Sequence, residues 1–335
     1  MKAIGYNKSL PATDSNALID IEIDKPVATG HDILVRIEAI SVNPVDTKIR
    51  HRVSPEDDQY KILGWDATGV VESTGEDVTL FSVGDKVWYA GAIDRQGTNC
   101  EFHLVDERIA AKMPSSLNFT EAAAMPLTSI TAWEILFDRL KLTKDSTGSL
   151  LIIGAAGGVG SMMIQLAKQL TQLTVIATAS REETQQWVTS LGADFVINHH
   201  QPLSEELKRI KHNEISFIAS LTNTGQHLSE IQTIIKPQGS LAVIDDPEQL
   251  DIMPFKTKSV SIHWELMFTR SLFQTDDMIE QHHLLTKVSE LVDQGKLNTT
   301  LNQNFGSINA TNLLKAHQLI ETGQSTGKIV LSGFG

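Results

Sequence analysis

Alternation of hydrophobic and polar residues marks the N-terminal part of the chain. Within residues 33–40, Ile33, Val35 and Ile37 fall on one side of an extended backbone, and Arg36 falls on the other. This period of two residues predicts a strand with one buried face. Further short apolar runs, separated by turn-forming residues, occur at residues 67–72, 86–90 and 101–105. We therefore predict a compact, mostly antiparallel β unit over roughly the first 110 residues.

The pattern changes after Pro114, where residues 121–124 and 130–140 have helical composition and spacing. From Ser149 onward, strand-length apolar runs alternate with helix-length amphipathic runs. The strand-like runs are residues 150–154, 174–179, 195–198, 215–221, 241–244 and 259–264, and the helix-like runs are residues 159–170, 182–191 and 225–235. This alternation predicts a parallel sheet with helices on both faces. Residues 278–294 and 312–321 are again helical, and residues 328–331 are typical of a final strand.

Chain length sets the number of domains. The chain has 335 residues, and at about 150 residues per domain it is long enough for two domains with separate cores. We predict an α/β domain with a doubly wound parallel sheet over residues 129–266. The last ~70 residues are too few for a domain of their own, so residues 267–335 are expected to pack with residues 1–128.

Charge and cysteine content exclude several classes of protein. Lys and Arg total 28 against 41 Asp and Glu, and the net charge of -13 is unfavourable for binding a nucleic-acid backbone. Cys100 is the only cysteine, so no intramolecular disulfide and no thiolate-rich zinc site can form. A reducing, cytoplasmic location is expected. The chain has no signal-peptide core and no apolar run of about 18 residues, so we expect no membrane span.

A glycine-rich turn lies between a strand pattern and a helix pattern, in the sequence Gly154-Ala155-Ala156-Gly157-Gly158-Val159-Gly160. Glycines at such a turn let the backbone approach a pyrophosphate, whose charge is held by free N–H groups at the helix N-terminus. The turn therefore predicts a dinucleotide site, and a tight structural turn is the alternative.

The next predicted strand ends about 20 residues later, where an acidic residue would bind the ribose 2′-hydroxyl of NAD. The sequence there is Thr178-Ala179-Ser180-Arg181. Because no carboxylate repels a 2′-phosphate and a hydroxyl and a guanidinium are available to hold it, we predict NADP(H) as the cofactor. The alternative is that Arg181 is a solvated residue at a helix start.

Several motifs in order resemble the medium-chain dehydrogenases/reductases. They include Gly157-Gly158-Val159-Gly160, Leu191-Gly192-Ala193-Asp194 and Gly327-Lys328-Ile329-Val330-Leu331. The stretches Val42–Arg50, Gly64–Gly69, Ala122–Thr128 and His263–Ser271 look most like the quinone oxidoreductase branch, in particular the proteins called zinc-type alcohol dehydrogenase-like. The resemblance covers nearly the whole chain. It implies a Rossmann domain and a GroES-like, mostly antiparallel β domain.

The resemblance departs from the zinc enzymes at the metal ligands. Zinc-dependent members have a cysteine where this chain has Asn43, and a Gly-His-Glu run where it has Gly64-Trp65-Asp66. Asn and Trp cannot replace a thiolate and an imidazole at tetrahedral zinc. The pairs His199-His200 and His282-His283 point to different faces, and Cys100 reads as a buried hydrophobe. We therefore predict no metal site.

The resemblance also implies where substrate and cofactor bind. Asn43 and Asp46 are placed in the loop that faces the nicotinamide, and the alternative is a loop with a helix cap. Candidate donors to a substrate carbonyl are Lys48, at a position where some quinone oxidoreductases have a tyrosine, and Arg50 and Arg270, for which surface ion pairs are the alternative. The residues implied for the cofactor are Asn43, Thr128, Ala156, Gly157, Gly158, Val159, Gly160, Ser180, Arg181, Ser220, Leu221 and Lys328. Four aromatic residues could line a flat pocket or belong to the core: Trp65, Trp133, Trp264 and Phe268.

These observations predict a zinc-independent, NADPH-dependent oxidoreductase that reduces quinones or α,β-unsaturated carbonyls. Without a Lewis acid, an alkoxide is hard to stabilise, whereas an enolate or phenolate oxygen needs only hydrogen-bond donors. Two alternatives remain: a zinc-type alcohol dehydrogenase, and an NADPH-binding sensor or structural protein without turnover. A homodimer is expected by family analogy, through an edge strand near residues 258–264.

Overall fold

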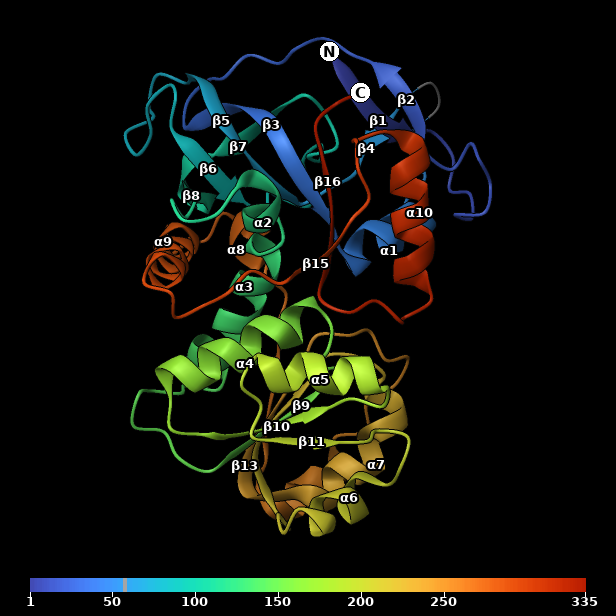
Figure 1. Cartoon of the computed structure of the whole chain (residues 1–335), viewed down its shortest axis with the longest axis vertical. Coiled ribbons are helices and arrows are strands. Elements are labelled where there is room, and N and C mark those ends of the chain that lie inside the picture. Colours follow the sequence, from blue (N-terminus) through green and yellow to red (C-terminus); the bar gives the residue numbers. More distant parts are fainter. Residues whose placement is uncertain (57–58) are drawn as a thin grey trace. The chain divides into compact units, whose positions relative to one another are not determined.

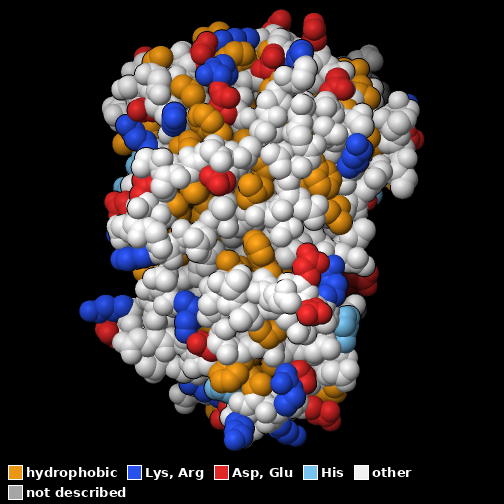
Figure 2. Space-filling view, viewed as in Figure 1, with side chains coloured by type: hydrophobic (Ala, Val, Ile, Leu, Met, Phe, Trp, Pro, Cys, Tyr) orange, Lys and Arg blue, Asp and Glu red, His pale blue; other side chains and the backbone are white. Residues whose placement is uncertain are grey.

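The computed structural model describes residues 1–56 and 59–335, which form two compact units (Figure 1). Unit 1 consists of Met1–Ile130 and Phe268–Gly335, and unit 2 consists of Thr131–Met267. Among the described residues, no helix is both long enough and apolar enough to cross a membrane. On the face shown in Figure 2, acidic and basic side chains are interspersed.

Unit 1 is built on two β-sheets. The larger has the order β15-β16-β3-β5-β6-β8, with β7 also pairing with β3. Its pairs are antiparallel except β15–β16. Its strands are β3 (Asp32–Val42), β5 (Asp66–Thr74), β6 (Lys86–Tyr89), β7 (Phe102–Asp106), β8 (Ala110–Lys112), β15 (Leu301–Asn304) and β16 (Lys328–Ser332). The smaller antiparallel sheet has the order β2-β1-β4, with β1 (Lys2–Tyr6), β2 (Ile19–Glu22) and β4 (Lys61–Ile62).

Unit 1 also contains helices, several of which pack on these sheets. They are α1 (Pro44–Arg52), α2 (Phe119–Ala123), α8 (Thr269–Phe273), α9 (Glu280–Asp293) and α10 (Ala310–Glu321), with a short 3-10 helix at Glu107–Ile109. Helix α3 (Pro126–Trp133) begins in unit 1 and ends in unit 2. The C-terminal strand β16 pairs with β3, with Ile329 opposite Val42. This pairing brings residues at the two ends of the sequence together.

Unit 2 is a parallel sheet with the order β11-β10-β9-β12-β13-β14. Its strands are β9 (Ser149–Ile153), β10 (Thr174–Thr178), β11 (Phe195–Ile197), β12 (Ile215–Ser220), β13 (Ile235–Val243) and β14 (Ser261–Trp264). The connecting helices are α4 (Gly158–Leu170), α5 (Glu182–Ser190), α6 (Leu203–Arg209) and α7 (Thr224–Ile234), with a 3-10 helix at Met253–Lys258. The strand order reverses between β9 and β12, which is where doubly wound folds bind ligands.

The fold class predicted from the sequence is confirmed. Strand β9 is buried along its whole length, as expected for an interior parallel strand. The sequence prediction of one helical stretch over residues 130–140 is incomplete, because α3 is followed by a π-helix at Glu134–Arg139. Over six residues, the spacing of hydrophobic positions in an α-helix and in a π-helix is too similar for the sequence to distinguish the two.

Candidate functional site

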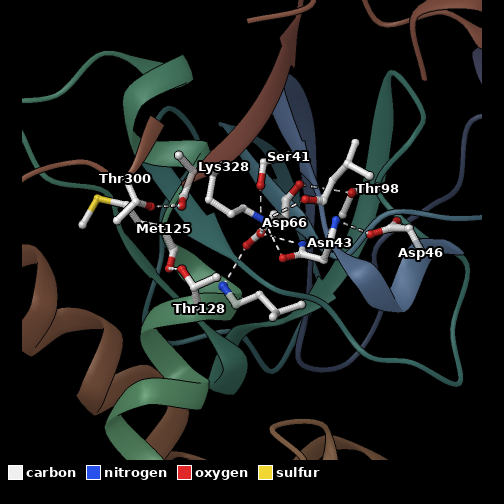
Figure 3. A network of polar contacts seen from close by, with 12 residues as sticks. Ser41, Asn43, Asp46, Asp66, Thr98, Met125, Thr128, Thr300 and Lys328 are labelled. Atoms are coloured by element: carbon white, nitrogen blue, oxygen red, sulfur yellow. Dashed lines mark hydrogen bonds and ion pairs between the residues drawn. The ribbon is translucent and has the colours of Figure 1, made fainter. Parts of the chain in front are cut away.

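A buried polar network surrounds Asp66 in unit 1 (Figure 3). Asp66 is the first residue of β5 and has no exposed surface. Its Oδ2 atom accepts hydrogen bonds from Ser41 Oγ at 2.9 Å, Asn43 Nδ2 at 2.8 Å and Lys328 Nζ at 3.0 Å. Its Oδ1 atom accepts from the backbone N–H of Leu127, in the first turn of α3, at 2.8 Å. Buried charges in proteins are paired and hydrogen-bonded, and this carboxylate meets both conditions.

Lys328 supplies the positive charge of the network. It is the first residue of β16 and is 4% exposed. Its Nζ donates to the backbone oxygen of Val42 at 2.9 Å, to Asn43 Oδ1 and to Asp66 Oδ2. An ammonium group has three hydrogens to donate, and each has an acceptor here. The predicted contact of Lys328 with a cofactor phosphate or ribose would need one of these bonds to break.

Asn43 is held in one orientation by its two charged neighbours. The ammonium group of Lys328 can only donate, so Oδ1 of Asn43 faces this ammonium and Nδ2 of Asn43 donates to the Asp66 carboxylate. Asn43 is also the N-cap of α1, and its backbone N–H donates to Asp46 Oδ2 at 2.8 Å. The helix-cap alternative for Asn43 and Asp46 is therefore present, alongside their place in the network.

Burial raises the pKa of Asp46 to about 7. Desolvation is the largest cause, and the nearby Asp66 carboxylate adds to it, whereas hydrogen bonds from Asn43 and Gly64 and the charge of Lys328 act in the opposite direction. Loss of hydration disfavours the charged form of a carboxyl group. Asp46 can therefore exchange a proton near neutral pH, in direct contact with Asn43.

Three threonines surround the network, and each hydroxyl donates to a backbone oxygen. Thr98 donates to Asp66 at 3.3 Å, Thr128 to Met125 at 3.0 Å and Thr300 to Ala124 at 2.8 Å. The sequence singled out Thr128 for the cofactor but gave no signal for Ser41, Thr98 or Thr300. Asp66 appeared only within a family motif, although an acid inside a buried strand pattern is itself a signal.

The predicted substrate donors lie in different surroundings. Arg50 has no exposed surface, and its guanidinium donates to His317 Nδ1 at 3.3 Å, to the Leu10 backbone oxygen and to Glu321. Arg50 therefore forms an ion pair, with Glu321, but the arginine is buried and not at the surface as the alternative supposed, and the pair ties α1 to α10 inside unit 1.

Lys48 and Arg270 remain partly accessible. Lys48 is half-buried on α1. Arg270 is on α8, where its Nε donates to Asp277 Oδ2 at 3.1 Å.

In unit 2, the glycine-rich turn joins β9 to α4. Gly154 has φ +82° and donates its N–H to Thr178 Oγ1 at 3.0 Å. A Cβ at Gly160 would lie 2.4 Å from the backbone oxygen of Ala155, so this glycine is required for helix–strand packing. A Cβ at Gly157 would meet only the Gly154 oxygen, at 3.6 Å. The fold therefore has room at Gly157, as a turn that cradles a pyrophosphate requires.

The other residues predicted for the cofactor follow the neighbouring strands. Ala156, Gly158 and Val159 are half-buried within the turn. Ser180 is half-buried and Arg181 is exposed at the start of α5. Ser180 and Arg181 follow the carboxyl end of β10, which is adjacent to the end of β9. The glycine turn and the predicted 2′-phosphate site thus share one edge of the sheet.

Ser220 and Leu221 follow β12 at the same edge. A Cβ at Gly154 would lie 3.6 Å from Leu221 Cβ, so this loop adjoins the glycine turn. The Ser220 hydroxyl is fully buried and lies 2.7 Å from Thr224 Oγ1. Leu221 therefore remains available to border an adenosine, whereas Ser220 supports the loop from inside.

The residues at the zinc-ligand positions do not fit zinc. Asn43 is engaged with Lys328 and Asp66, and Trp65 is fully buried with its indole N–H donating to Ala92 at 3.1 Å. Over residues 1–56 and 59–335, no group of three or more His, Cys, Asp or Glu side chains could hold a metal ion. Zinc sites in proteins are built from thiolate, imidazole and carboxylate ligands.

Cys100 is buried, as predicted, and is not an activated nucleophile. Burial raises the pKa of its thiol to about 12. A reactive cysteine needs a lowered pKa.

The four aromatic residues do not form a single wall within one unit. Trp65 and Phe268 are buried in unit 1 with ring centroids 6.0 Å apart, which supports the core alternative for both. Trp133 packs edge-on against Phe137 at 4.7 Å. Trp264 is 56% exposed on the edge strand β14.

Comparisons with known proteins agree with this architecture. Residues 29–120 match the alcohol dehydrogenase GroES-like domain family, and residues 191–331 match the zinc-binding dehydrogenase family. A zinc-type alcohol dehydrogenase-like protein of Staphylococcus epidermidis is 39% identical over 337 residues, which cover 99% of each chain.

Solved structures show the same likeness. A candidate zinc-dependent alcohol dehydrogenase from Rhizobium etli has 55% identity and a TM-score of 0.97, covering 100% of this chain and 98% of the other. The quinone oxidoreductase from Coxiella burnetii has 26% identity and a TM-score of 0.81, covering 99% of each chain. The chain therefore belongs to the medium-chain dehydrogenase/reductase superfamily of oxidoreductases, with a GroES-like domain and quinone oxidoreductases among its structural neighbours, as the sequence predicted.

Proposed function

We propose that this protein is a zinc-independent oxidoreductase that uses NADPH to reduce a quinone or an α,β-unsaturated carbonyl compound. The observation that carries the proposal is the edge of the parallel sheet in unit 2. At this edge, a side chain at Gly157 would meet only one neighbouring atom, so the turn has space for a ligand. Ser180 and Arg181 follow β10, at the place where NAD-binding proteins have an acidic residue for the ribose. This combination favours a dinucleotide with a 2′-phosphate.

The residues of this edge would bind and orient the cofactor. Backbone N–H groups in the first turn of α4 would hold the pyrophosphate, and Ser180 and Arg181 would hold the 2′-phosphate. Leu221 would border the adenosine. NADPH, when bound, supplies the hydride for the reaction.

The class of acceptor follows from the side chains at the zinc-ligand positions. Asn43 and Trp65 cannot polarise an alcohol or ketone oxygen as a metal does. Hydride addition to a conjugated carbon instead places charge on an enolate or phenolate oxygen, which hydrogen-bond donors can stabilise. Similarity to the quinone oxidoreductase from Coxiella burnetii supports this class.

We assign Asn43 and Asp46 to the acceptor side of the reaction. Lys328 and Asp66 fix the orientation of the Asn43 amide, so this amide is held in place to contact the acceptor or to donate a hydrogen bond to it. Asp46, with its pKa raised to about 7, can hold the proton that completes the two-electron reduction. Lys48 and Arg270 are the remaining candidate donors to the acceptor oxygen. Arg50 is not assigned, because its donors bind Leu10, His317 and Glu321.

We also propose a cytoplasmic homodimer. Strand β14 lies at the end of the parallel sheet, with Trp264 56% exposed, and the outer edge of such a strand presents backbone groups that can pair with a second copy. Gel filtration should show a dimer, and a 36.8 kDa monomer would contradict this part of the proposal.

The test is a panel of acceptors with purified, metal-analysed protein. NADPH oxidation, followed by absorbance, should be fast with quinones or enones and slow with simple ketones, and NADPH should be preferred to NADH. Turnover of simple ketones with one zinc per chain would favour an alcohol dehydrogenase instead. Tight NADPH binding without turnover on any acceptor would favour a sensor or structural protein.

A further inference from the structure

In zinc-dependent members of the superfamily, a cysteine that binds zinc stands at the position of Asn43. In this chain, the side chain at that position contacts the ammonium group of a lysine. Asn43, at that position, binds the ammonium group of Lys328, and the same ammonium lies 3.0 Å from the buried carboxylate of Asp66 (Figure 3). The two residues that make the ion pair are separated by 262 positions in the sequence. Their contact is created by the pairing of β16 with β3 and of β3 with β5.

We propose that Lys328 is the built-in cation of this site: its ammonium takes the electrostatic place of a divalent metal, positions Asn43 and Asp66, and keeps metal ions out. The proposal extends the zinc independence of the proposed function. It treats Lys328 as a positioning residue, because its contacts are with the protein.

The exclusion of a metal follows from charge and from the available oxygens. The ammonium already occupies the three oxygens that face it, from Val42, Asn43 and Asp66. A divalent ion at the same oxygens would lie within a few ångströms of a positive charge in a buried region, where like charges repel strongly. The ion pair thus satisfies the carboxylate and blocks a competing cation.

Positioning follows from what Asp66 holds. One carboxylate oxygen fixes the amide of Asn43 at the start of α1, and the other fixes the backbone of Leu127 at the start of α3. Both hydrogen bonds end on a carboxylate that has no exposed surface, and burying a carboxylate is costly unless a cation and hydrogen-bond donors compensate for its lost hydration. Lys328 therefore maintains the arrangement of two helix N-termini around the site.

The substitution Lys328→Met tests the proposal in the full-length protein. Methionine has a similar apolar stem but is one atom shorter, so it removes the charge and leaves three oxygens without their donor. Oxygen donors of this kind bind hard divalent cations. After dialysis against MnCl2, with bound metal measured by elemental analysis and electron paramagnetic resonance, the variant should hold about one ion per chain. The wild-type protein should hold none at this stoichiometry.

Lys258→Met is the matched control. The Lys258 ammonium also donates to three oxygens, the backbone carbonyls of Gln232, Thr233 and Ile235, but no carboxylate is among them. Removing it should therefore produce no metal binding. If Lys258→Met gained a metal ion to the same extent as Lys328→Met, the effect would not depend on the carboxylate and the proposal would be wrong.

A second variant covers failure of Lys328→Met to fold. In Lys328→Met with Asp66→Asn, the uncompensated charge is removed as well, and breaking a buried pair is more destabilising than replacing both partners. The double variant should therefore melt at a higher temperature than Lys328→Met and should bind no metal. A double variant that melts no higher than the single one would overturn the proposal.

Lys328→Arg keeps the positive charge and should bind no manganese. Two further results would overturn the proposal: a folded Lys328→Met that takes up no metal, and a wild-type protein that binds one divalent ion per chain. Both results are measurements of bound metal and do not require enzyme activity. A wild-type preparation without NADPH:quinone oxidoreductase activity would therefore contradict the proposed function and leave the role of Lys328 unaffected. The two hypotheses are thereby distinguished.

Discussion

Two alanine substitutions three residues apart should separate cofactor binding from folding. The backbone of Gly157 has φ −73° and ψ 176°, an extended conformation open to any residue, and an added Cβ would meet only the Gly154 oxygen at 3.6 Å. An added Cβ at Gly160 would lie 2.4 Å from the Ala155 oxygen and 2.5 Å from Ala155 Cα. The first position has space in the protein alone, and the second has none.

The magnitudes follow from these distances. Gly157→Ala should lower the free energy of unfolding by at most about 1 kcal/mol, because alanine is a poor N-cap. Gly160→Ala must push α4 away from the end of β9, and such overpacking costs about 1–3 kcal/mol. At Gly157 the new methyl group would hinder a phosphate from reaching the N–H groups. Loss of one charge-assisted hydrogen bond, about 1.5–3 kcal/mol, corresponds to NADPH binding that is about 10- to 150-fold weaker.

Urea unfolding followed by tryptophan fluorescence measures the change in the free energy of unfolding, and calorimetric titration measures the change in NADPH affinity. Gly157→Ala should unfold almost as the wild type does and bind NADPH poorly. Unchanged NADPH affinity in Gly157→Ala would refute the argument that the space at Gly157 belongs to the cofactor. Equal destabilisation by both substitutions would refute the argument from packing.

Three further predictions concern charge and titration. Arg181→Glu should weaken NADPH binding far more than NADH binding, because it replaces a phosphate partner by a repelling group; equal losses in calorimetric titrations would count against the 2′-phosphate site. Asp46, with a pKa raised from 3.8 to about 7, contributes stability that is complete below pH 3.8 and is lost as the pH rises through 7. Asp46→Asn should therefore flatten the fall in unfolding free energy between about pH 4 and pH 7, and an unchanged slope would contradict the raised pKa. Cys100, buried with a pKa raised to about 12, should react with a thiol reagent at pH 8 only after unfolding, and stoichiometric reaction of the native protein would show that it is accessible.

Much of the fold could be predicted because its signals are local. The alternation over residues 33–40 lies within β3, and the apolar runs after Ser149 correspond to β9 through β14. Each depends on the period of a strand or helix, which neighbouring residues in the sequence determine. Strands β2, β4, β8 and β15 lie outside the predicted runs, because two to four residues carry little periodicity of their own. Strand β11 is equally short and was predicted because it belongs to the alternating series of strands and helices.

The glycine-rich turn could likewise be predicted, because the residues that identify it are seven consecutive positions between a strand and a helix. The Asp66 network could not, because Lys328 and Asp66 are brought together only by the order of strands in a sheet. A lysine inside the apolar run 328–331 was the available signal, since lysine is rarely buried without a partner. One sequence could identify that lysine as unusual, but the partner depends on tertiary structure.

The central claim is that hydride transfer in this protein needs no metal, and the most direct test compares one preparation in two states. The protein is dialysed against a strong chelator, analysed for metal, and divided, and one half receives stoichiometric zinc. NADPH oxidation with the best quinone or enone acceptor is then measured in both halves. We predict equal rates and no retained zinc. Loss of activity on chelation with recovery on adding one zinc per chain would contradict the account.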